Sequence, residues 1–128
     1  MFCTDCEKLL SVSARLGASL LKSGAEIYRV EDSMQRIFSA YGIEGGIFAT
    51  STCIIASLTD EQGHSVSKTL RIHFRTTDLD RVAELNDLCR RICSSPPSLE
   101  EFEREVFKIE QRPVYPFSLT VAAFAVIS

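Results

Sequence analysis

The last 16 residues of the chain, Pro113 to Ser128, carry no charged side chain, whereas every Lys, Arg, Asp and Glu lies between Asp5 and Arg112. From Phe117 onward the segment has 12 residues, fewer than the roughly 20 that a membrane-spanning helix needs. It also lacks the glycine, proline or basic residue that usually ends a helix. On composition, the segment is either the last core helix of a soluble domain or a transmembrane helix cut short.

The polar part has the composition of a soluble globular domain. With 14 Lys+Arg against 17 Asp+Glu and a net charge of −3, it is not expected to bind nucleic acid through bulk charge. A hydrophobic content of 45% and a charged content of 24% exclude disordered and low-complexity classes. The six uncharged residues between Lys8 and Arg15 are too few for a secretory signal. Five scattered cysteines fit a reducing compartment, so we expect the polar part in the cytoplasm.

Hydrophobic periodicity predicts two helices in the first third of the chain. Apolar residues recur at helical spacing from Asp5 to Ser23 and again from Glu26 to Tyr41. The Ser23-Gly24 pair separates the two runs, and glycine commonly ends a helix. We therefore expect an αα-hairpin, in which small residues such as Gly17 let another helix approach the first helix closely.

Two further helices are predicted toward the end of the polar part. Thr77 or Asp78 is expected to cap the first of them. Ser94-Ser-Pro-Pro97 ends it, because proline lacks a backbone donor and disfavours helix in the residue before it. Ser98-x-x-Glu101 is typical of a capping box and predicts a fourth helix with the apolar stripe Leu99, Phe102, Val106 and Ile109.

Between the second and third helices the pattern changes from helix to strand. After Gly45-Gly46, residues Ile47 to Thr59 predict one long or two short strands, with Thr52, Ile54, Ala56 and Leu58 on one face. Asp60 to Gly63 predicts a hairpin loop, and strict alternation from Val66 to Arg75 predicts a further strand. The predicted fold class is α+β: an αα-hairpin, a small mainly antiparallel sheet of two to three strands, two further helices, then the start of a transmembrane helix.

Motifs for metal binding and catalysis give little support to an enzyme. Cys3-x-x-Cys6 and Cys89-x-x-x-Cys93 could supply four thiolates to zinc. Cys89, however, lies in an apolar stripe, and nothing in the sequence brings the two pairs together, so we predict neither a metal site nor a cofactor. His64 and His73 are the two histidines, and the common protease, hydrolase and phosphate-binding motifs are missing.

Two polar clusters are candidates for function. Glu26 and Arg29 are neighbours at the start of the second helix, where they form either a functional pair or a surface ion pair of little energetic consequence. On the strand after the hairpin loop, the polar face consists of Thr69, Arg71, His73 and Arg75. That face could hold a carboxylate, because arginine binds one bidentately, or it could simply be solvated.

Four segments together resemble the N-terminal domain of the threonine/serine exporter family: Ser23–Glu31, Thr50–Thr52, Lys68–Arg71 and Asp78–Leu88. The resemblance runs from about Leu9 into the apolar end. It implies a hydrophilic α+β domain ahead of a bundle of transmembrane helices, in inner-membrane exporters of small amino acids such as threonine and serine. Where two proteins form the transporter, it implies export of succinate, with this domain in the larger partner and a small all-membrane protein completing the assembly.

The resemblance also identifies motif positions in this chain, without a family role attached to any of them. The matching motif positions are Glu26, Arg29, Glu31, Thr50, Thr52, Thr69 and Arg71. For Arg29 and Glu31 we favour a structural or coupling role over substrate contact. Residues 1–112 are expected to form a cytoplasmic domain and residues 113–128 the truncated start of the first transmembrane helix, so the chain alone would not transport.

The orientation of the domain can be predicted without the resemblance. Three basic residues precede the apolar end: Arg104, Lys108 and Arg112. Basic residues next to a membrane segment stay on the cytoplasmic side.

The expected partners follow from the same resemblance. They are the missing transmembrane bundle or a small all-membrane protein, further copies of the chain, and a small amino acid or dicarboxylate substrate, but no nucleic acid. An alternative is a soluble ligand-binding or regulatory domain whose apolar end is a core or dimerisation helix. A hydrolase, the weakest hypothesis, would need Arg71 or His73 next to Glu26 or Glu31.

Overall fold

A computed structural model of the chain describes residues 2–60, 62–73 and 76–111, with side chains from Cys6 onward. The elements, in chain order, are α1 (Phe2–Lys22), α2 (Ile27–Ala40), β1 (Glu44–Ala49), β2 (Cys53–Thr59), β3 (Ser65–Arg71), α3 (Leu79–Ser94) and α4 (Leu99–Gln111). The strands form one antiparallel sheet in the order β1-β2-β3. The predicted α+β class, the αα-hairpin and the two later helices are confirmed.

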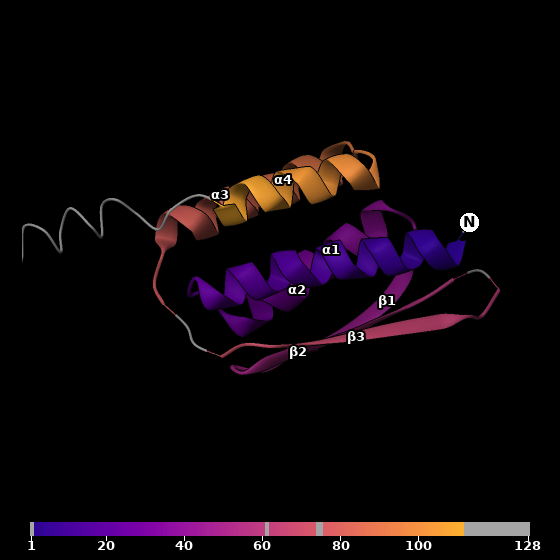
Figure 1. Ribbon diagram of the computed structural model, residues 1–128, viewed down its shortest axis with the longest axis horizontal. Coiled ribbons are helices and arrows are strands. Elements are labelled where there is room, and N and C mark those ends of the chain that lie inside the picture. Colours follow the sequence, from indigo (N-terminus) through magenta and orange to yellow (C-terminus); the bar gives the residue numbers. More distant parts are fainter. Residues whose placement is uncertain (1, 61, 74–75, 112–128) are drawn as a thin grey trace, which may run out of the picture.

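The elements stack in three layers (Figure 1). The sheet forms one layer, α1 and α2 lie across one of its faces, and α3 and α4 cover the helical layer on the side away from the sheet. None of the described helices is long and apolar enough to cross a membrane. The expected start of a transmembrane helix, residues 113–128, lies outside the described residues.

Helix α1 is the centre of the domain because it is buried on more than one side. Leu16, Leu20 and Leu21 are fully buried although they lie at different angles around the helix. Gly17 permits the predicted close approach: a Cβ there would lie 2.5 Å from Met34 Sδ of α2. The small residues of α1 thus allow α2 and the sheet to pack against it.

Gly45 and Gly46, expected to precede the first strand, lie inside β1. Glycine is disfavoured in strands, so the sequence predicted a start at Ile47, but packing overrides this preference. A Cβ on Gly45 would lie 2.6 Å from Leu58 Cδ2 and 2.7 Å from Phe38 Cδ2. Glycine is therefore required where the end of α2 presses on the sheet.

Replacing Gly45 by alanine should destabilise the domain by about 1–3 kcal/mol, the usual cost of overpacking a filled core. Gly46→Ala is the matched control, because a Cβ on the neighbouring glycine meets nothing within 4 Å. Urea unfolding of the two purified variants measures the difference. Equal stabilities would show that Gly45 is not confined by Phe38 and Leu58.

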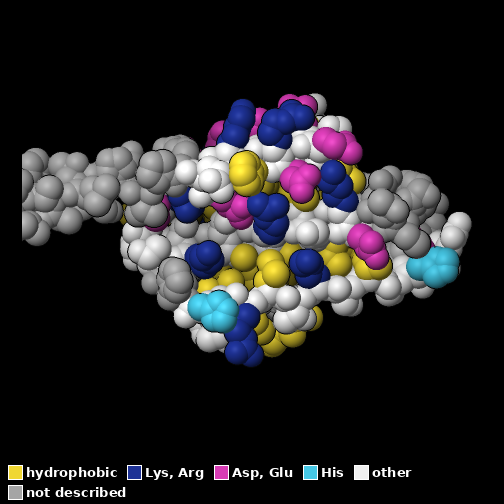
Figure 2. Space-filling view, viewed as in Figure 1, with side chains coloured by type: hydrophobic (Ala, Val, Ile, Leu, Met, Phe, Trp, Pro, Cys, Tyr) yellow, Lys and Arg dark blue, Asp and Glu magenta, His cyan; other side chains and the backbone are white. Residues whose placement is uncertain are grey.

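The two faces of the sheet differ sharply. Ile54, Ala56 and Leu58 of β2 are buried under the helices, as their alternation predicts. On the opposite face, which no described helix covers, Phe48 is 60% exposed and its cross-strand neighbour Ile55 is 42% exposed. Over the helices, by contrast, acidic and basic side chains are intermixed (Figure 2).

Two predictions for the strands need correction. Thr52, expected to share a strand face with Ile54, Ala56 and Leu58, is instead an exposed residue of the β1–β2 turn. The strand expected to reach Arg75 ends at Arg71, although Ile72 is still buried and its N–H donates to the Thr52 carbonyl at 2.7 Å. Phe74 and Arg75 lie outside the described residues.

The expected caps position the last two helices. The Asp78 side chain accepts from the Arg81 N–H at 3.1 Å at the start of α3. At the start of α4, Ser98 Oγ accepts from the Glu101 N–H at 3.2 Å. The Asp60–Gly63 loop also forms as predicted, with Gly63 at φ +88°. These elements carry local signals, and the sequence located them well.

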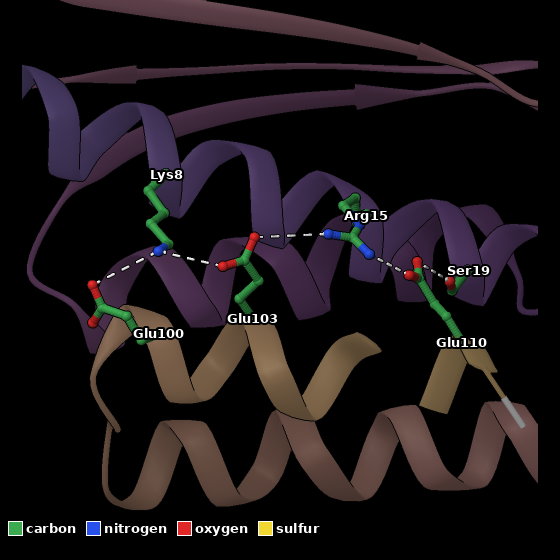
Figure 3. A network of polar contacts seen from close by, with 6 residues as sticks. All are labelled: Lys8, Arg15, Ser19, Glu100, Glu103 and Glu110. Carbon is green, nitrogen blue, oxygen red and sulfur yellow. Dashed lines mark hydrogen bonds and ion pairs between the residues drawn. The ribbon is translucent and has the colours of Figure 1, made fainter. Parts of the chain in front are cut away.

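A polar network across two helices attaches α4 to α1 (Figure 3). Lys8 Nζ lies 3.3 Å from Glu103 Oε1 and 3.7 Å from Glu100 Oε2. In the last turn of α4, Glu110 contacts both Arg15 Nη2, at 2.5 Å, and Ser19 Oγ, at 3.1 Å. Single exposed ion pairs stabilise little, but connected ones fix geometry. The network therefore sets the position of the helix that leads to residues 112–128.

Candidate functional site

The three motif residues of α2 have different surroundings. Glu26 is the N-cap residue, but its side chain makes no capping hydrogen bond. Among the described residues, no ion pair joins it to Arg29, although the i, i+3 spacing would permit one. Glu31, by contrast, accepts a hydrogen bond from the backbone N–H of Ala49, with Oε2 2.9 Å from the nitrogen. Because Ala49 ends β1, Glu31 ties α2 to the sheet.

Thr50 organises the turn that follows. Its Oγ1 accepts from the N–H groups of Thr52, at 3.2 Å, and Cys53, at 3.1 Å. The Thr50 N–H in turn donates to the Cys53 carbonyl at 2.8 Å. A side-chain oxygen that accepts from the backbone in this way stabilises a tight turn. In the described structure, Thr50 therefore shapes the backbone, while Thr52 contributes an exposed hydroxyl.

The predicted β3 residues lie on the uncovered face of the sheet. Thr69 is exposed and stands opposite Ile55, and Arg71 is exposed opposite Cys53. Arg71 thus lies at the same end of the sheet as the Thr50–Thr52 turn and the Glu31 contact. The structure brings four of the predicted residues, Glu31, Thr50, Thr52 and Arg71, to this end, but not Arg29.

Replacing Glu31 by alanine should lower the free energy of unfolding by about 1–3 kcal/mol, because the N–H of the buried residue Ala49 loses a charged acceptor. Glu26→Ala removes a carboxylate from the same helix without breaking a described hydrogen bond, and it should stay within about 0.5 kcal/mol of the unmodified protein. Chemical unfolding of both variants provides the comparison. A smaller loss for Glu31→Ala than for Glu26→Ala would contradict the anchoring role.

Arg29 instead lines a groove between α2 and α3, which encloses about 410 Å³. We call it the α2–α3 groove. Its α2 wall consists of Arg29, Asp32, Ser33 and Arg36. Its α3 wall consists of Asn86, Cys89, Arg90, Cys93 and Ser94. The spacing explains the geometry, because residues three, four and seven positions apart share one face of a helix.

The groove carries more positive than negative charge. Arg36 Nε binds Asp32 Oδ2 at 2.8 Å within α2, and Arg90 Nη2 lies 3.6 Å from Asp87 Oδ1, which is not part of the lining. Arg29 has no acidic partner among the residues that the structure describes. An arginine without a carboxylate keeps its planar set of donors available to an external anion.

The floor of the groove is buried. Ser33 and Cys89 are 7% and 6% exposed, and the Cys89 thiol donates to the Ser33 carbonyl at 3.6 Å. Burial, with a smaller effect of Cys93, raises the pKa of the Cys89 thiol to about 12. At neutral pH Cys89 is therefore a neutral thiol rather than a reactive thiolate.

The structure places the described cysteines of the possible zinc set in separate parts of the domain. Cys89 and Cys93 line the α2–α3 groove, whereas Cys6 is buried beside Tyr41 and Leu99 in a separate pocket. Within the described ranges no three Cys, His, Asp or Glu residues gather closely enough to hold a metal ion. The side chain of Cys3 lies outside the description.

The sequence did not predict that residues of α2 and α3 together form the α2–α3 groove. The polar face formed by Arg29, Asp32 and Arg36 was visible from its spacing, and Asn86 and Arg90 show similar spacing on α3. Nothing local indicates, however, that α2 and α3 pack side by side. Such pairings depend on the whole fold.

Comparisons with known proteins place the chain in a family. A family model described as "Putative threonine/serine exporter" matches residues 11–128. A Mycobacterium tuberculosis protein named "Probable threonine/serine exporter" is 27% identical over 121 residues, which are 92% of this chain and 23% of that protein. The chain thus spans less than a quarter of this relative's length. No solved structure matches it. With nearly all of its residues matched by the family model, the chain belongs to the threonine/serine exporter family.

Proposed function

We propose that this chain forms the cytoplasmic domain of a membrane exporter of small amino acids, with threonine and serine as substrates. The family match over residues 11–128 carries the proposal, because it includes both the folded domain and the apolar end. The Mycobacterium tuberculosis relative, whose name describes a threonine/serine exporter, supports the same substrate class. Small dicarboxylates such as succinate are the second substrate class to test.

The charge distribution supports the proposed orientation. Arg104 and Lys108 lie on the exposed side of α4, and Arg112 follows them immediately before the apolar residues 113–128. Lys and Arg next to a membrane segment are retained on the cytoplasmic side. We therefore place the domain at the inner face of the plasma membrane, where it meets a transmembrane bundle or a small all-membrane partner.

The packing of α4 supports a coupling role for the domain. Glu110, in the last turn of α4, is held by Arg15 and Ser19 of the central helix α1. A displacement of the membrane-proximal end of α4 would therefore reach α1, which contacts both the sheet and α2. In this proposal the whole domain moves as a rigid unit when the membrane part moves.

Deletion of the gene in its host tests the export function. Cells fed dipeptides that contain threonine or serine should accumulate the free amino acid when the gene is deleted and release it again when the intact gene is restored. A leucine dipeptide serves as the control, because leucine is outside the proposed class, and succinate efflux is measured in parallel. Unchanged release of threonine, serine and succinate would contradict the proposal.

A further inference from the structure

The α2–α3 groove has the local charge that an anion requires. Three arginines and one aspartate line it, in a protein whose overall net charge is −3. A cleft in which one sign of charge predominates concentrates ions of the opposite sign. The groove therefore attracts anions against the charge of the protein as a whole.

The donors come from two helices and converge on one space. Arg29 on α2 has no acidic partner among the described residues, and Arg90 on α3 lies within the same groove. Asn86 and Ser94 add an amide and a hydroxyl to the lining. Arginine matches the planar, paired oxygens of carboxylates and phosphates better than lysine does. These are the groups expected around a small oxyanion.

The size and depth of the groove favour a small molecule. Its volume of about 410 Å³ lies within the usual range for small-molecule sites. The buried floor at Ser33 and Cys89 closes the groove beneath a bound ligand, while the exposed Arg29 and Arg90 on its walls can be reached from solvent.

We propose that the α2–α3 groove binds a small oxyanion, a carboxylate or a phosphate, between Arg29 of α2 and Arg90 of α3. Arg29 supplies the guanidinium that no described carboxylate occupies, and Arg90 closes the site from the other helix. Occupancy would link α2, which carries the family motif, to α3. Binding at this groove does not depend on export by the protein.

Titration of the purified protein with succinate, threonine and inorganic phosphate, at constant ionic strength, tests the site. A ligand that binds the folded state raises the unfolding temperature in a saturable way. At least one of the three ligands should raise the unfolding temperature in this way. The ligand that binds most tightly identifies the class that the groove prefers: a dicarboxylate, an amino acid or a phosphate. Arg29→Ala and Arg90→Ala should each weaken that binding about tenfold, as expected for the loss of a charge-assisted contact.

Two controls keep the result specific. Arg104→Ala removes an equal charge from an exposed position on α4, outside the groove, and it should leave the affinity unchanged. Arg29→Lys keeps the charge but loses the paired donors, so its affinity should fall between those of the unmodified protein and Arg29→Ala. The proposal would be overturned if none of the three ligands bound saturably. It would also be overturned if Arg104→Ala weakened binding as much as Arg29→Ala does. Far-UV circular dichroism confirms that each variant is folded.

Discussion

Replacing Phe102 by alanine should lower the free energy of unfolding by about 3–5 kcal/mol, the usual cost of removing a buried aromatic side chain. Phe102 is fully buried and is the main apolar anchor of α4. Its ring stacks on Tyr41, with centroids 6.2 Å apart and planes 12° apart. Because whole domains are stable by only about 5–15 kcal/mol, this one change should remove a large part of the total.

Tyr41 makes the loss more severe, because its position depends on the same packing. Its hydroxyl donates to the Pro97 carbonyl at 2.7 Å, just ahead of α4. Burial raises the pKa of Tyr41 to about 12, so the hydroxyl keeps its proton and the hydrogen bond at neutral pH. Loss of the Phe102 ring would leave a cavity beside this contact and loosen the start of α4.

Phe107→Ala is the matched control for this experiment. Phe107 lies on the same helix but is 51% exposed, so its removal should change the stability by no more than about 0.5 kcal/mol. Urea midpoints of the two variants measure the contrast. Similar losses for both would mean that α4 does not dock through Phe102.

Replacing Arg29 by alanine in the complete gene should reduce threonine and serine release to the level of the deletion strain. The reason is chemical rather than structural. Arg29 is exposed and has no acidic partner in the described part of the chain, so its loss should leave the fold intact. The substitution nevertheless removes a guanidinium that lines the α2–α3 groove. Amino-acid release and the amount of protein in the membrane fraction are measured in the same cells.

Arg104→Ala should release both amino acids at the unmodified rate, because it alters an exposed arginine away from the groove. Normal release by a stably produced Arg29→Ala protein would contradict a functional role for Arg29. Arg29→Ala protein that is absent from the cell would instead reveal a structural role, which the exposed side chain does not predict.

The elements that the sequence predicted well are those whose geometry depends on residues close by in the chain. Asp78 and Ser98 cap their helices through contacts within three residues, and Gly63 supplies the positive φ of its turn. Their geometry depends on the neighbouring backbone, so the residue pattern was sufficient. The same holds for the apolar stripe of α4, in which Phe102, Val106 and Ile109 are buried and Leu99 is partly buried against the core.

The features that the sequence did not predict depend on distant contacts. Gly45 belongs to a strand despite its weak preference for one, because Phe38 and Leu58 occupy the space of its missing side chain. Arg15 and Glu110 meet although they are 95 positions apart in the chain. In the candidate site, the motif on α2 divides between Glu31, which anchors the sheet, and Arg29, which lines the α2–α3 groove. Positions two residues apart on a helix can face different neighbours, and only the packing of α2 reveals which neighbour each one meets.

Labelling of Cys93 in membrane vesicles tests most directly whether this domain lies on the cytoplasmic side of a membrane exporter. Cys93 is exposed, whereas Cys6 and Cys89 are buried. With Cys3 and Cys53 replaced by serine, a membrane-impermeant maleimide should label Cys93 in inside-out vesicles and leave it unlabelled in right-side-out vesicles. A Cys93→Ser variant gives the background signal. Labelling in right-side-out vesicles, or recovery of the protein only in the soluble fraction, would contradict the proposed location.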